Sequence, residues 1–384
     1  MHIHMSSPDL TDADRQAVQE VLNTPILSMG KHTPAFEKTF CDLTGAKHAV
    51  AVNSGTAGLH LCVRAAGIGT GDLVITTPFS FVASSNVMLF ENAIPIFVDV
   101  DARTGNINPE LLADAADNID KYLPRKGKSK NAKLKALLPV DVFGQPADMD
   151  AINAVARKHN LKVIEDSCEA LGATYKSKQA GTLGDFGVFA FYPNKQITTG
   201  EGGVIITNDD KAADFMRALR NQGRAPGDTW LQHTHLGYNY RIDEMSAALG
   251  QTQMQRLDEL LKKREQVAAW YEARLSEIPA VEVPFVESST TRMSWFVYVI
   301  RFDAKINRDD IAKRLEARGI PVRPYFLPIH LQPYMAERFG WRAGDFPVTE
   351  DLGRRGLAVP FSSVMTEAQV EAVCAAIRDE IEAA

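Results

Sequence analysis

The chain has 384 residues, of which 45% are hydrophobic and 23% are charged. At roughly 150 residues per domain this length predicts two or three domains, with cores large enough to need no metal or disulfide. The composition excludes a disordered, collagenous or coiled-coil protein, and the net charge of −6 argues against a large nucleic-acid surface.

Short β-rich runs alternate with helical stretches through the first two thirds of the chain. The predicted strands are His48–Val52, Asp72–Thr77, Pro95–Asp101, Ala136–Val142, Lys162–Asp166, Val188–Tyr192 and Val204–Thr207. The helices predicted between them include Ala57–Ala66, Ser84–Glu91, Pro109–Asn118 and Met149–His159. Most of the strands are continuous apolar runs, typical of strands that helices cover on both faces. The pattern predicts an α/β fold built on a mostly parallel sheet.

The connection between the last two of these strands is unusually short. Residues 193–203 read Pro-Asn-Lys-Gln-Ile-Thr-Thr-Gly-Glu-Gly-Gly, whereas a parallel crossover needs a dozen or more residues and a helix. We therefore expect these two strands to pair antiparallel through a glycine-rich loop, which makes the sheet mixed, with one reversed strand.

The C-terminal third lacks the regular alternation of strands and helices. A proline-free stretch from Arg241 to about Arg274 predicts one long helix that joins two domains. After it, Ser294–Phe302 is predicted as a strand, Arg308–Ala317 as a helix and Thr366–Ala383 as a closing helix. We expect a large α/β domain over residues 1–254 and a smaller α+β domain over residues 255–384.

Several features predict a soluble cytoplasmic protein that holds no metal. The four cysteines form no CxxC pair and no metal-finger spacing, so we expect structural thiols in a reducing compartment. No apolar run approaches the roughly 18 residues of a membrane helix, and residues 1–5 contain no apolar signal region. Residues 125–135 contain six Lys or Arg, which we interpret as a solvated loop rather than a phosphate site.

Candidate functional groups follow three strands, and open α/β sheets bind ligands at the carboxyl ends of their strands. Residues 53–58, Asn-Ser-Gly-Thr-Ala-Gly, open a helix whose free N–H groups can hold an anion, although an N-cap at Ser54 or Thr56 explains the same residues. Asp166 ends a buried strand and either caps a turn or faces a cationic ligand nitrogen. Lys195 lies in the short glycine-rich loop, where it is either a solvated surface group or an amine for imine chemistry.

Taken together, a phosphate cradle, a carboxylate for a ring nitrogen and a lysine amine are what pyridoxal phosphate requires. The strings that carry a further resemblance are SGTAGL, TPFSFVASSN, IEDSCEALGA, GTLGDFGVFAFYPNKQITTGEGG, GYNYRIDEMSAALG and PIHLQPYM. In these strings the chain resembles the DegT/DnrJ/EryC1/StrS family of sugar aminotransferases, which are pyridoxal phosphate enzymes of the aspartate aminotransferase fold (fold type I). The resemblance runs in order from about Leu27 to the C-terminus.

The resemblance implies roles for residues around the cofactor. Lys195 would be the Schiff-base lysine and Asp166 the partner of the pyridinium nitrogen. Gly55 and Thr56 would hold the cofactor phosphate. Phe81 would stack on the face of the cofactor ring, with a place in the ordinary core as the alternative.

It also implies roles further from the lysine. Asn239 would reach across a dimer interface to the neighbouring subunit's phosphate, with a helix-start residue as the alternative. His330 would lie near the sugar, with an ordinary hydrogen-bonded histidine as the alternative. The negative charge of a nucleotide diphosphate would need basic groups at the rim of the site. Arg220, Arg224 and Arg323 are the candidates, with ordinary surface arginines as the alternative.

Two positions depart from the family pattern. Ala190 stands where the family usually has a serine that bonds the phosphate, so one phosphate contact is lost or replaced. Glu169 stands where glutamine or histidine commonly faces the ring hydroxyl. A carboxylate there would repel a phenolate oxygen unless a proton is shared between them, or it points elsewhere.

The resemblance implies a homodimeric aminotransferase with shared active sites, acting in amino-sugar and surface-polysaccharide biosynthesis. L-glutamate would convert the cofactor to pyridoxamine phosphate, which would then aminate a nucleotide-linked keto sugar, expected to be a 4-keto-6-deoxyhexose. A cyclitol or other carbocyclic ketone is an alternative acceptor. A sugar dehydratase, which has histidine in place of the lysine, and a non-catalytic regulatory relative are further alternatives, and the presence of Lys195 and Asp166 argues against both.

Overall fold

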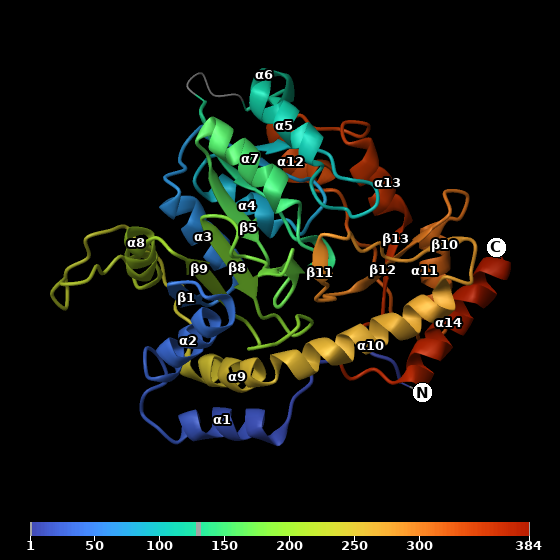
Figure 1. Ribbon diagram of the computed structural model, residues 1–384, viewed down its shortest axis with the longest axis horizontal. Coiled ribbons are helices and arrows are strands. Elements are labelled where there is room, and N and C mark those ends of the chain that lie inside the picture. The colour runs from blue at the N-terminus through green and yellow to red at the C-terminus, as the bar shows by residue number, and fades with distance from the viewer. Residues whose placement is uncertain (1, 128–131, 384) are drawn as a thin grey trace.

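A seven-stranded sheet forms the centre of the computed structural model, which describes residues 2–127 and 132–383 (Figure 1). Its strand order is β1-β9-β8-β5-β4-β2-β3. The strands are β1 (His48–Val52), β2 (Leu73–Thr76), β3 (Ile94–Phe97), β4 (Leu134–Leu138), β5 (Lys162–Asp166), β8 (Phe186–Ala190) and β9 (Gly203–Thr207). β9 runs antiparallel to β1 and β8, and the other pairs are parallel. The predicted mixed sheet with one reversed strand is confirmed.

Helices cover both faces of this sheet. The α-helices of the described residues are α1 (Asp12–Leu22), α2 (His32–Thr44), α3 (Gly55–Ala65), α4 (Ala83–Phe90), α5 (Pro109–Asp117), α6 (Ile119–Tyr122), α7 (Met149–His159), α8 (Asp210–Arg220), α9 (Glu244–Gln255), α10 (Leu257–Leu275), α11 (Arg308–Ala317), α12 (Pro333–Phe339), α13 (Pro347–Arg355) and α14 (Glu367–Glu382). Two short 3₁₀ turns are η1 (Val142–Gly144) and η2 (Ile329–Leu331).

The central strands are apolar on both faces because each face has its own core. On β8, Val188 belongs to the cluster that includes α3 and α8, whereas the next residue, Phe189, packs against Phe40 of α2 on the opposite face. Successive side chains of a strand point to opposite faces, so a strand between two cores must be apolar throughout. This explains the continuous apolar runs of the sequence.

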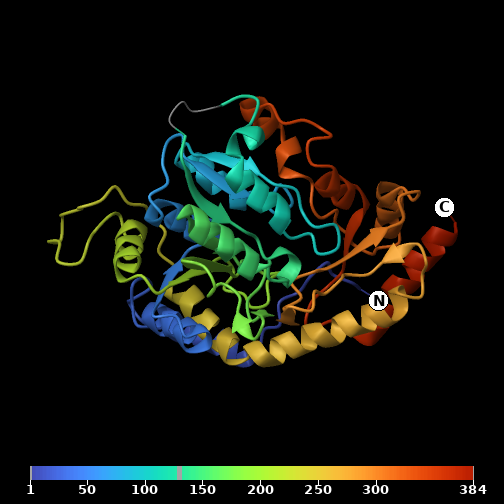
Figure 2. The ribbon, with the colours of Figure 1, turned by 45° about the horizontal axis from the view of Figure 1, so that its top comes forward.

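A smaller antiparallel sheet lies beside the large one. Its strands are β10 (Val281–Glu282), β12 (Tyr298–Phe302) and β13 (Gly356–Val359). Its core cluster includes residues of α10, α11 and α14, and Figures 1 and 2 show α10 running from the large sheet towards α14. A third sheet joins β11 (Thr290–Arg292) to β6 (Thr174–Tyr175) and β7 (Lys178–Gln179). The domain division at residue 254 stays a prediction.

The beginning of the chain packs against its end. Ile3 is buried in the core cluster of the smaller sheet. The N–H of Phe361 donates to the carbonyl of Met5 at 2.9 Å, and Gln369 Nε2 donates to the carbonyl of His2 at 3.1 Å. The N-terminal segment therefore belongs structurally to the C-terminal core.

The predicted long helix over residues 241–274 is wrong as a single element. The structure has two helices, α9 and α10, separated at Arg256, whose φ of −105° and ψ of 6° depart from the α-helix. Asp258 and Glu259 fall in the first turn of α10, where the helix dipole favours negative charge. These acids are a start signal within the proline-free stretch.

The predicted strand Ser294–Phe302 begins only at Tyr298. The N–H groups of Ser294 and Phe296 instead donate to the carbonyls of Gly144 and Phe143, at 3.2 and 3.1 Å. These bonds bring the segment next to the carboxyl end of the large sheet. Strand β4 likewise stops at Leu138, before Pro139, which has no N–H to donate to a neighbouring strand.

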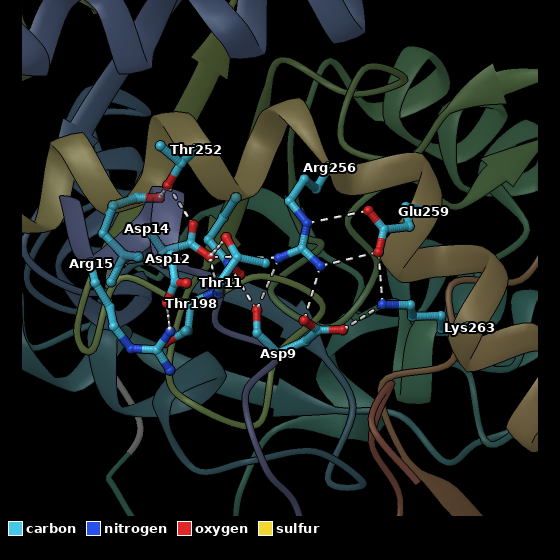
Figure 3. A network of polar contacts seen from close by, with 12 residues as sticks. Asp9, Thr11, Asp12, Asp14, Arg15, Thr198, Thr252, Arg256, Glu259 and Lys263 are labelled. Carbon is cyan, nitrogen blue, oxygen red and sulfur yellow. Dashed lines mark hydrogen bonds and ion pairs between the residues drawn. The ribbon is translucent and has the colours of Figure 1, made fainter. Parts of the chain in front are cut away.

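A charged network fixes the N-terminal segment to the junction of α9 and α10 (Figure 3). Asp9 pairs with Arg256 at 2.9 Å and with Lys263 at 2.8 Å, and Asp14 pairs with Arg256 at 3.5 Å. Burial opposes the charged form of Asp9, yet the bonds from Lys263 and Arg256 hold its pKa below the usual value. The network thus favours the ionised carboxylate and anchors the segment.

Two further features bear on what the surface contacts. In the described ranges 2–127 and 132–383, none of the helices combines the length and apolar character needed to cross a lipid bilayer. Within the basic run of residues 125–135, Arg125 pairs with Asp345 at 2.5 Å, and residues 128–131 lie outside the described residues.

The Asp9 network predicts a pH-dependent contribution to stability. At neutral pH, Asp9→Asn should lower the free energy of unfolding by about 1–3 kcal/mol, because two charge-assisted hydrogen bonds are lost. The folded-state pKa of Asp9 is lowered, so the contribution is complete above the unfolded value of 3.8 and is lost as the pH falls through the folded value. Urea unfolding at pH 7 and at acid pH measures the difference.

Asp12→Asn is the matched control, because Asp12 is exposed and pairs only with Arg15 in the described structure. It should leave the free energy of unfolding nearly unchanged. If the Asp9→Asn deficit persists undiminished once acid has protonated Asp9 in the folded protein, the charged form of Asp9 is not what stabilises the junction.

Candidate active site

Three strand ends converge at one edge of the large sheet. β1, β5 and β8 run in the same direction, since β9 is antiparallel to both β1 and β8 and β5 is parallel to β8. Their carboxyl ends therefore lie together, followed by Ser54, by Asp166 itself and by the loop that holds Lys195. This is the edge where open α/β sheets bind ligands.

The N-terminus of α3 lies against the end of β8. Ser54 is the N-cap, and its side chain accepts a hydrogen bond from the N–H of Ala57 at 3.1 Å. A Cβ added at Gly55 would lie 2.6 Å from Ala190 Cβ, so only glycine fits there. In the described residues the N–H groups of Gly55 and Thr56 bond no protein group. They are free to face an anion.

The two acids at the end of β5 have different tasks. The Glu165 carboxylate accepts hydrogen bonds from the backbone N–H groups of Gly181, Leu183 and Gly184, which makes it a structural residue. Asp166, on the other face of the strand, accepts from Ser84 Oγ at 2.7 Å and from the N–H of Cys168 at 3.3 Å. These two donors hold a buried carboxylate in a fixed orientation.

The Lys195 side chain is only 12% exposed, so the surface alternative is wrong. Its Nζ lies 3.6 Å from Glu169 Oε1 and 3.7 Å from the centre of the Phe296 ring. The other carboxylate oxygen of Glu169 accepts the N–H of Phe143 at 2.9 Å. Burial raises the pKa of Glu169, while the Lys195 ammonium opposes that shift. The structure therefore places a carboxylate next to the amine.

Phe81 and Asn239 both present exposed side chains. Phe81 is 63% exposed, which excludes the core alternative. Asn239 is exposed beside Asn53, whose Nδ2 donates to the Asn239 carbonyl at 3.3 Å. The N-cap of α9 is Asp243, so Asn239 is not the helix-start residue. Stacking by Phe81 and a cross-subunit contact by Asn239 stay predictions.

The two residues proposed to bind substrate have protein partners in the structure. His330 is fully buried; its Nε2 lies 3.0 Å from Glu350 Oε1, and burial lowers its pKa. These contacts match the ordinary hydrogen-bonded histidine, and a role towards the sugar stays a prediction. Arg323 is exposed and pairs with Glu316 at 3.1 Å, an arrangement that leaves it accessible to a ligand.

The other two arginines suggested for the rim differ from each other. Arg220 is buried and donates to Glu37 and to the Ala51 carbonyl, so the prediction that it binds substrate at the rim is wrong. Its cation instead pairs with the partly buried carboxylate of Glu37, which an uncharged residue would leave without a counter-ion. Arg224 is half-buried with its guanidinium 4.9 Å from the centre of the Trp230 ring.

Three residues that contact these groups were not predicted from the sequence to belong to the site. They are Ser84, Phe143 and Phe296. Ser84 orients Asp166, although 82 residues separate them. Phe296 reaches Lys195 because its segment leaves the smaller sheet. Only the string TPFSFVASSN contained a signal, since it includes Ser84. Phe143 and Phe296 read as ordinary apolar residues.

The donor set fits pyridoxal phosphate. The free N–H groups at the start of α3 suit a phosphate, the buried Asp166 carboxylate suits a protonated ring nitrogen, and the Lys195 amine suits an aldehyde. The methyl group of Ala190 lies against Gly55, so this position supplies shape rather than a hydroxyl.

Comparison with known proteins gives a consistent result. The model of the DegT/DnrJ/EryC1/StrS aminotransferase family matches residues 8–378. A GDP-perosamine synthase from Caulobacter vibrioides is 41% identical over 98% of this chain and 97% of its own length. Among solved structures, Helicobacter pylori PseC, an aminotransferase involved in the biosynthesis of pseudoaminic acid, has a TM-score of 0.90 at 28% identity and covers both chains fully. S. venezuelae DesV, solved with a ketimine intermediate, has a TM-score of 0.87 at 30% identity and covers 99% and 98% of the two chains.

The 3.6 Å approach of Glu169 to Lys195 predicts an electrostatic effect. An adjacent anion favours the protonated form of the nitrogen that links lysine to cofactor. Glu169→Gln should therefore lower the pH at which the visible absorption of the bound cofactor changes, by roughly one unit or more. Spectrophotometric titration measures the midpoint. Glu201→Gln, an exposed acid on the same loop, should leave it in place. An unshifted midpoint for Glu169→Gln would mean that Glu169 is uncharged or turned away.

Proposed function

The chain belongs to the DegT/DnrJ/EryC1/StrS aminotransferase family, and we propose that it transfers an amino group from L-glutamate to a nucleotide-linked keto sugar. It is an aminotransferase whose cofactor is pyridoxal phosphate. The observation that carries the proposal is the largely enclosed Lys195 amine, at the strand edge that also holds Asp166 and the start of α3. The relative named GDP-perosamine synthase supports the substrate class, since perosamine is an amino sugar.

Each residue of the site has a task in this reaction. Pyridoxal phosphate, when bound, supplies an electron sink for a carbanion. Asp166 would hold the proton on the ring nitrogen, and the Ser84 hydroxyl fixes the direction of its carboxylate. Lys195 would bind the cofactor covalently and, once released, its amine would carry a proton between the α-carbon of the amino donor and the aldehyde carbon of the cofactor. The Glu169 carboxylate would lie next to that amine and favour its positively charged form. The buried position of Glu169 keeps bulk water away from the proton transfer by Lys195.

A nucleotide-linked acceptor needs a binding group for its diphosphate. Arg323 is the candidate, because it is exposed and its partner Glu316 is itself a solvent-accessible residue that the ligand can displace. We propose a 4-keto-6-deoxyhexose as the sugar. We also propose a cytoplasmic location, which the four free thiols support.

A homodimer is part of the proposal. The segment between α8 and α9 projects from the body of the molecule (Figure 1). It exposes three large apolar side chains. Trp230 is 77% exposed, and Leu231 and Leu236 are each 81% exposed. Apolar side chains gathered on one projecting segment are typical of a protein interface. A second copy of the chain would cover them and bring Asn239, at the end of this segment, near the neighbouring site.

A substrate screen tests the proposed reaction. With pyridoxal phosphate and glutamate present, the enzyme should convert a nucleotide-linked 4-keto-6-deoxyhexose to its amine, detected by mass spectrometry. Hydride reduction should fix the cofactor on the peptide that contains Lys195. Lys195→Ala should abolish both the covalent attachment and the amination while the protein stays folded. Efficient turnover of a cyclitol ketone with every nucleotide sugar inert would replace the sugar substrate by a carbocycle.

A subunit-mixing experiment tests the shared site. Asn239→Asp places a negative charge where the neighbouring phosphate would lie, and Lys195→Ala removes the amine, so each variant alone should be inactive. After the two are mixed, one site of each hybrid dimer has both residues intact, and activity should reappear. Sedimentation gives the oligomeric state. An active monomer at working concentration, or no recovery among proven hybrids, contradicts the shared site.

A further inference from the structure

Arg264 of α10 is a buried arginine that bonds four backbone carbonyls. Its side chain is almost entirely enclosed, with 2% of the residue exposed. Nη2 donates to the carbonyls of Asn194 at 3.2 Å and Lys195 at 2.7 Å. Nη1 donates to the carbonyls of Trp295 at 3.1 Å and Phe296 at 3.2 Å. One guanidinium therefore connects two segments that are about a hundred residues apart in sequence.

The charge of Arg264 has no counter-ion nearby. No carboxylate of the described residues forms an ion pair with its guanidinium, and its Nε has no hydrogen-bond partner there. Burial lowers the pKa of Arg264 to about 10. Arg220, by contrast, is buried against the carboxylate of Glu37. A buried cation without a counter-ion is costly, and an apolar residue of similar size would often be as stable or more so.

One of the segments that Arg264 joins contains Lys195, and the other supplies an aromatic neighbour of its amine. The Phe296 ring contacts the Lys195 amine at 3.7 Å. Gln196, the residue after Lys195, donates through Nε2 to Ser294 Oγ at 2.8 Å and to the carbonyl of Glu169. The backbone of Lys195, its aromatic neighbour and its carboxylate neighbour thus form one bonded unit, with Arg264 behind it.

We propose that Arg264 is a positioning residue for Lys195, a role that rests on the proposed function of that lysine. Its planar fork of donors fixes the Asn194–Lys195 carbonyls and the Trp295–Phe296 carbonyls at one separation. The amine is thereby held between the Phe296 ring and Glu169. Misplacing a reacting group by about 1 Å can reduce a rate about a hundredfold. A rigid support behind Lys195 should therefore maintain kcat by keeping the amine in position.

Two substitutions separate the fork from the charge. Arg264→Met keeps an unbranched apolar side chain and removes every donor. Arg264→Lys keeps a charge but concentrates its donors at one point, so it can satisfy one pair of carbonyls and not both. We expect kcat to fall about 10- to 100-fold in Arg264→Met and less in Arg264→Lys. The KM for glutamate should change less than twofold, because Arg264 is almost fully enclosed and its bonded donors face backbone carbonyls.

A second measurement uses the cofactor-free protein and does not depend on activity. Amide hydrogen exchange in the loop around Lys195 and in residues 294–297 should become at least tenfold faster in both variants, while the strands of the large sheet keep their protection. The matched control is Arg274→Met, the same change on the same helix at an arginine paired with Glu367 at 2.7 Å. It should alter neither exchange in these segments nor kcat.

The outcomes distinguish this proposal from the proposed function. If Lys195→Ala still binds the cofactor covalently, the assigned role of the lysine fails whatever Arg264 does. If Lys195 is confirmed by labelling, but Arg264→Met keeps wild-type kcat and exchange, the positioning role is overturned. A uniform rise of exchange over the whole protein in both variants would make Arg264 a residue of general stability and would equally overturn it.

Discussion

The reversed direction of β9 is the constraint on which the site depends. Because β9 returns antiparallel beside β8, the connection between them stays at the carboxyl edge of the sheet instead of crossing a face. Lys195 therefore remains where β1 and β5 also end, within reach of residues that those strands deliver. A helix in this connection would have carried the lysine along one face of the sheet. A short glycine-rich loop and one antiparallel pair are enough to bring the groups together.

The charged groups at this edge of the sheet are stabilised mainly by oriented hydrogen bonds, and in the described structure only Lys195 among them faces an oppositely charged side chain. Lys195 faces Glu169, Asp166 is held by a hydroxyl and a backbone N–H, and Arg264 is surrounded by carbonyl dipoles. Buried charged groups require partners with good geometry. The partners here are Ser84 of α4 and, in the loop after β5, Cys168 and Glu169. The smaller sheet contributes through the segment that precedes β12, so both sheets are needed to complete the surroundings of the amine.

Much of this arrangement could be predicted from local patterns, and the remainder could not for identifiable reasons. Apolar runs located the strands, and the length of one loop predicted its antiparallel turn. Lys195 and Asp166 were found because each follows a buried strand. The contact of Phe296 with Lys195 depends on two segments meeting across the fold, which no local pattern encodes. Glu37, the ion-pair partner of Arg220, is also distant in sequence, so Arg220 was wrongly predicted to lie at the rim.

The packing of the first residues against the last core has a consequence for how the chain is synthesised. Ile3 is buried among residues of the smaller sheet and α14, and the carbonyl of Met5 accepts its bond from Phe361. A ribosome releases the N-terminal segment first, hundreds of residues before its binding surface exists. Contacts between such distant parts of a chain form late, since the intervening chain must first be ordered. Residues 3–5 must therefore remain undocked until Phe361 and α14 have been synthesised and ordered.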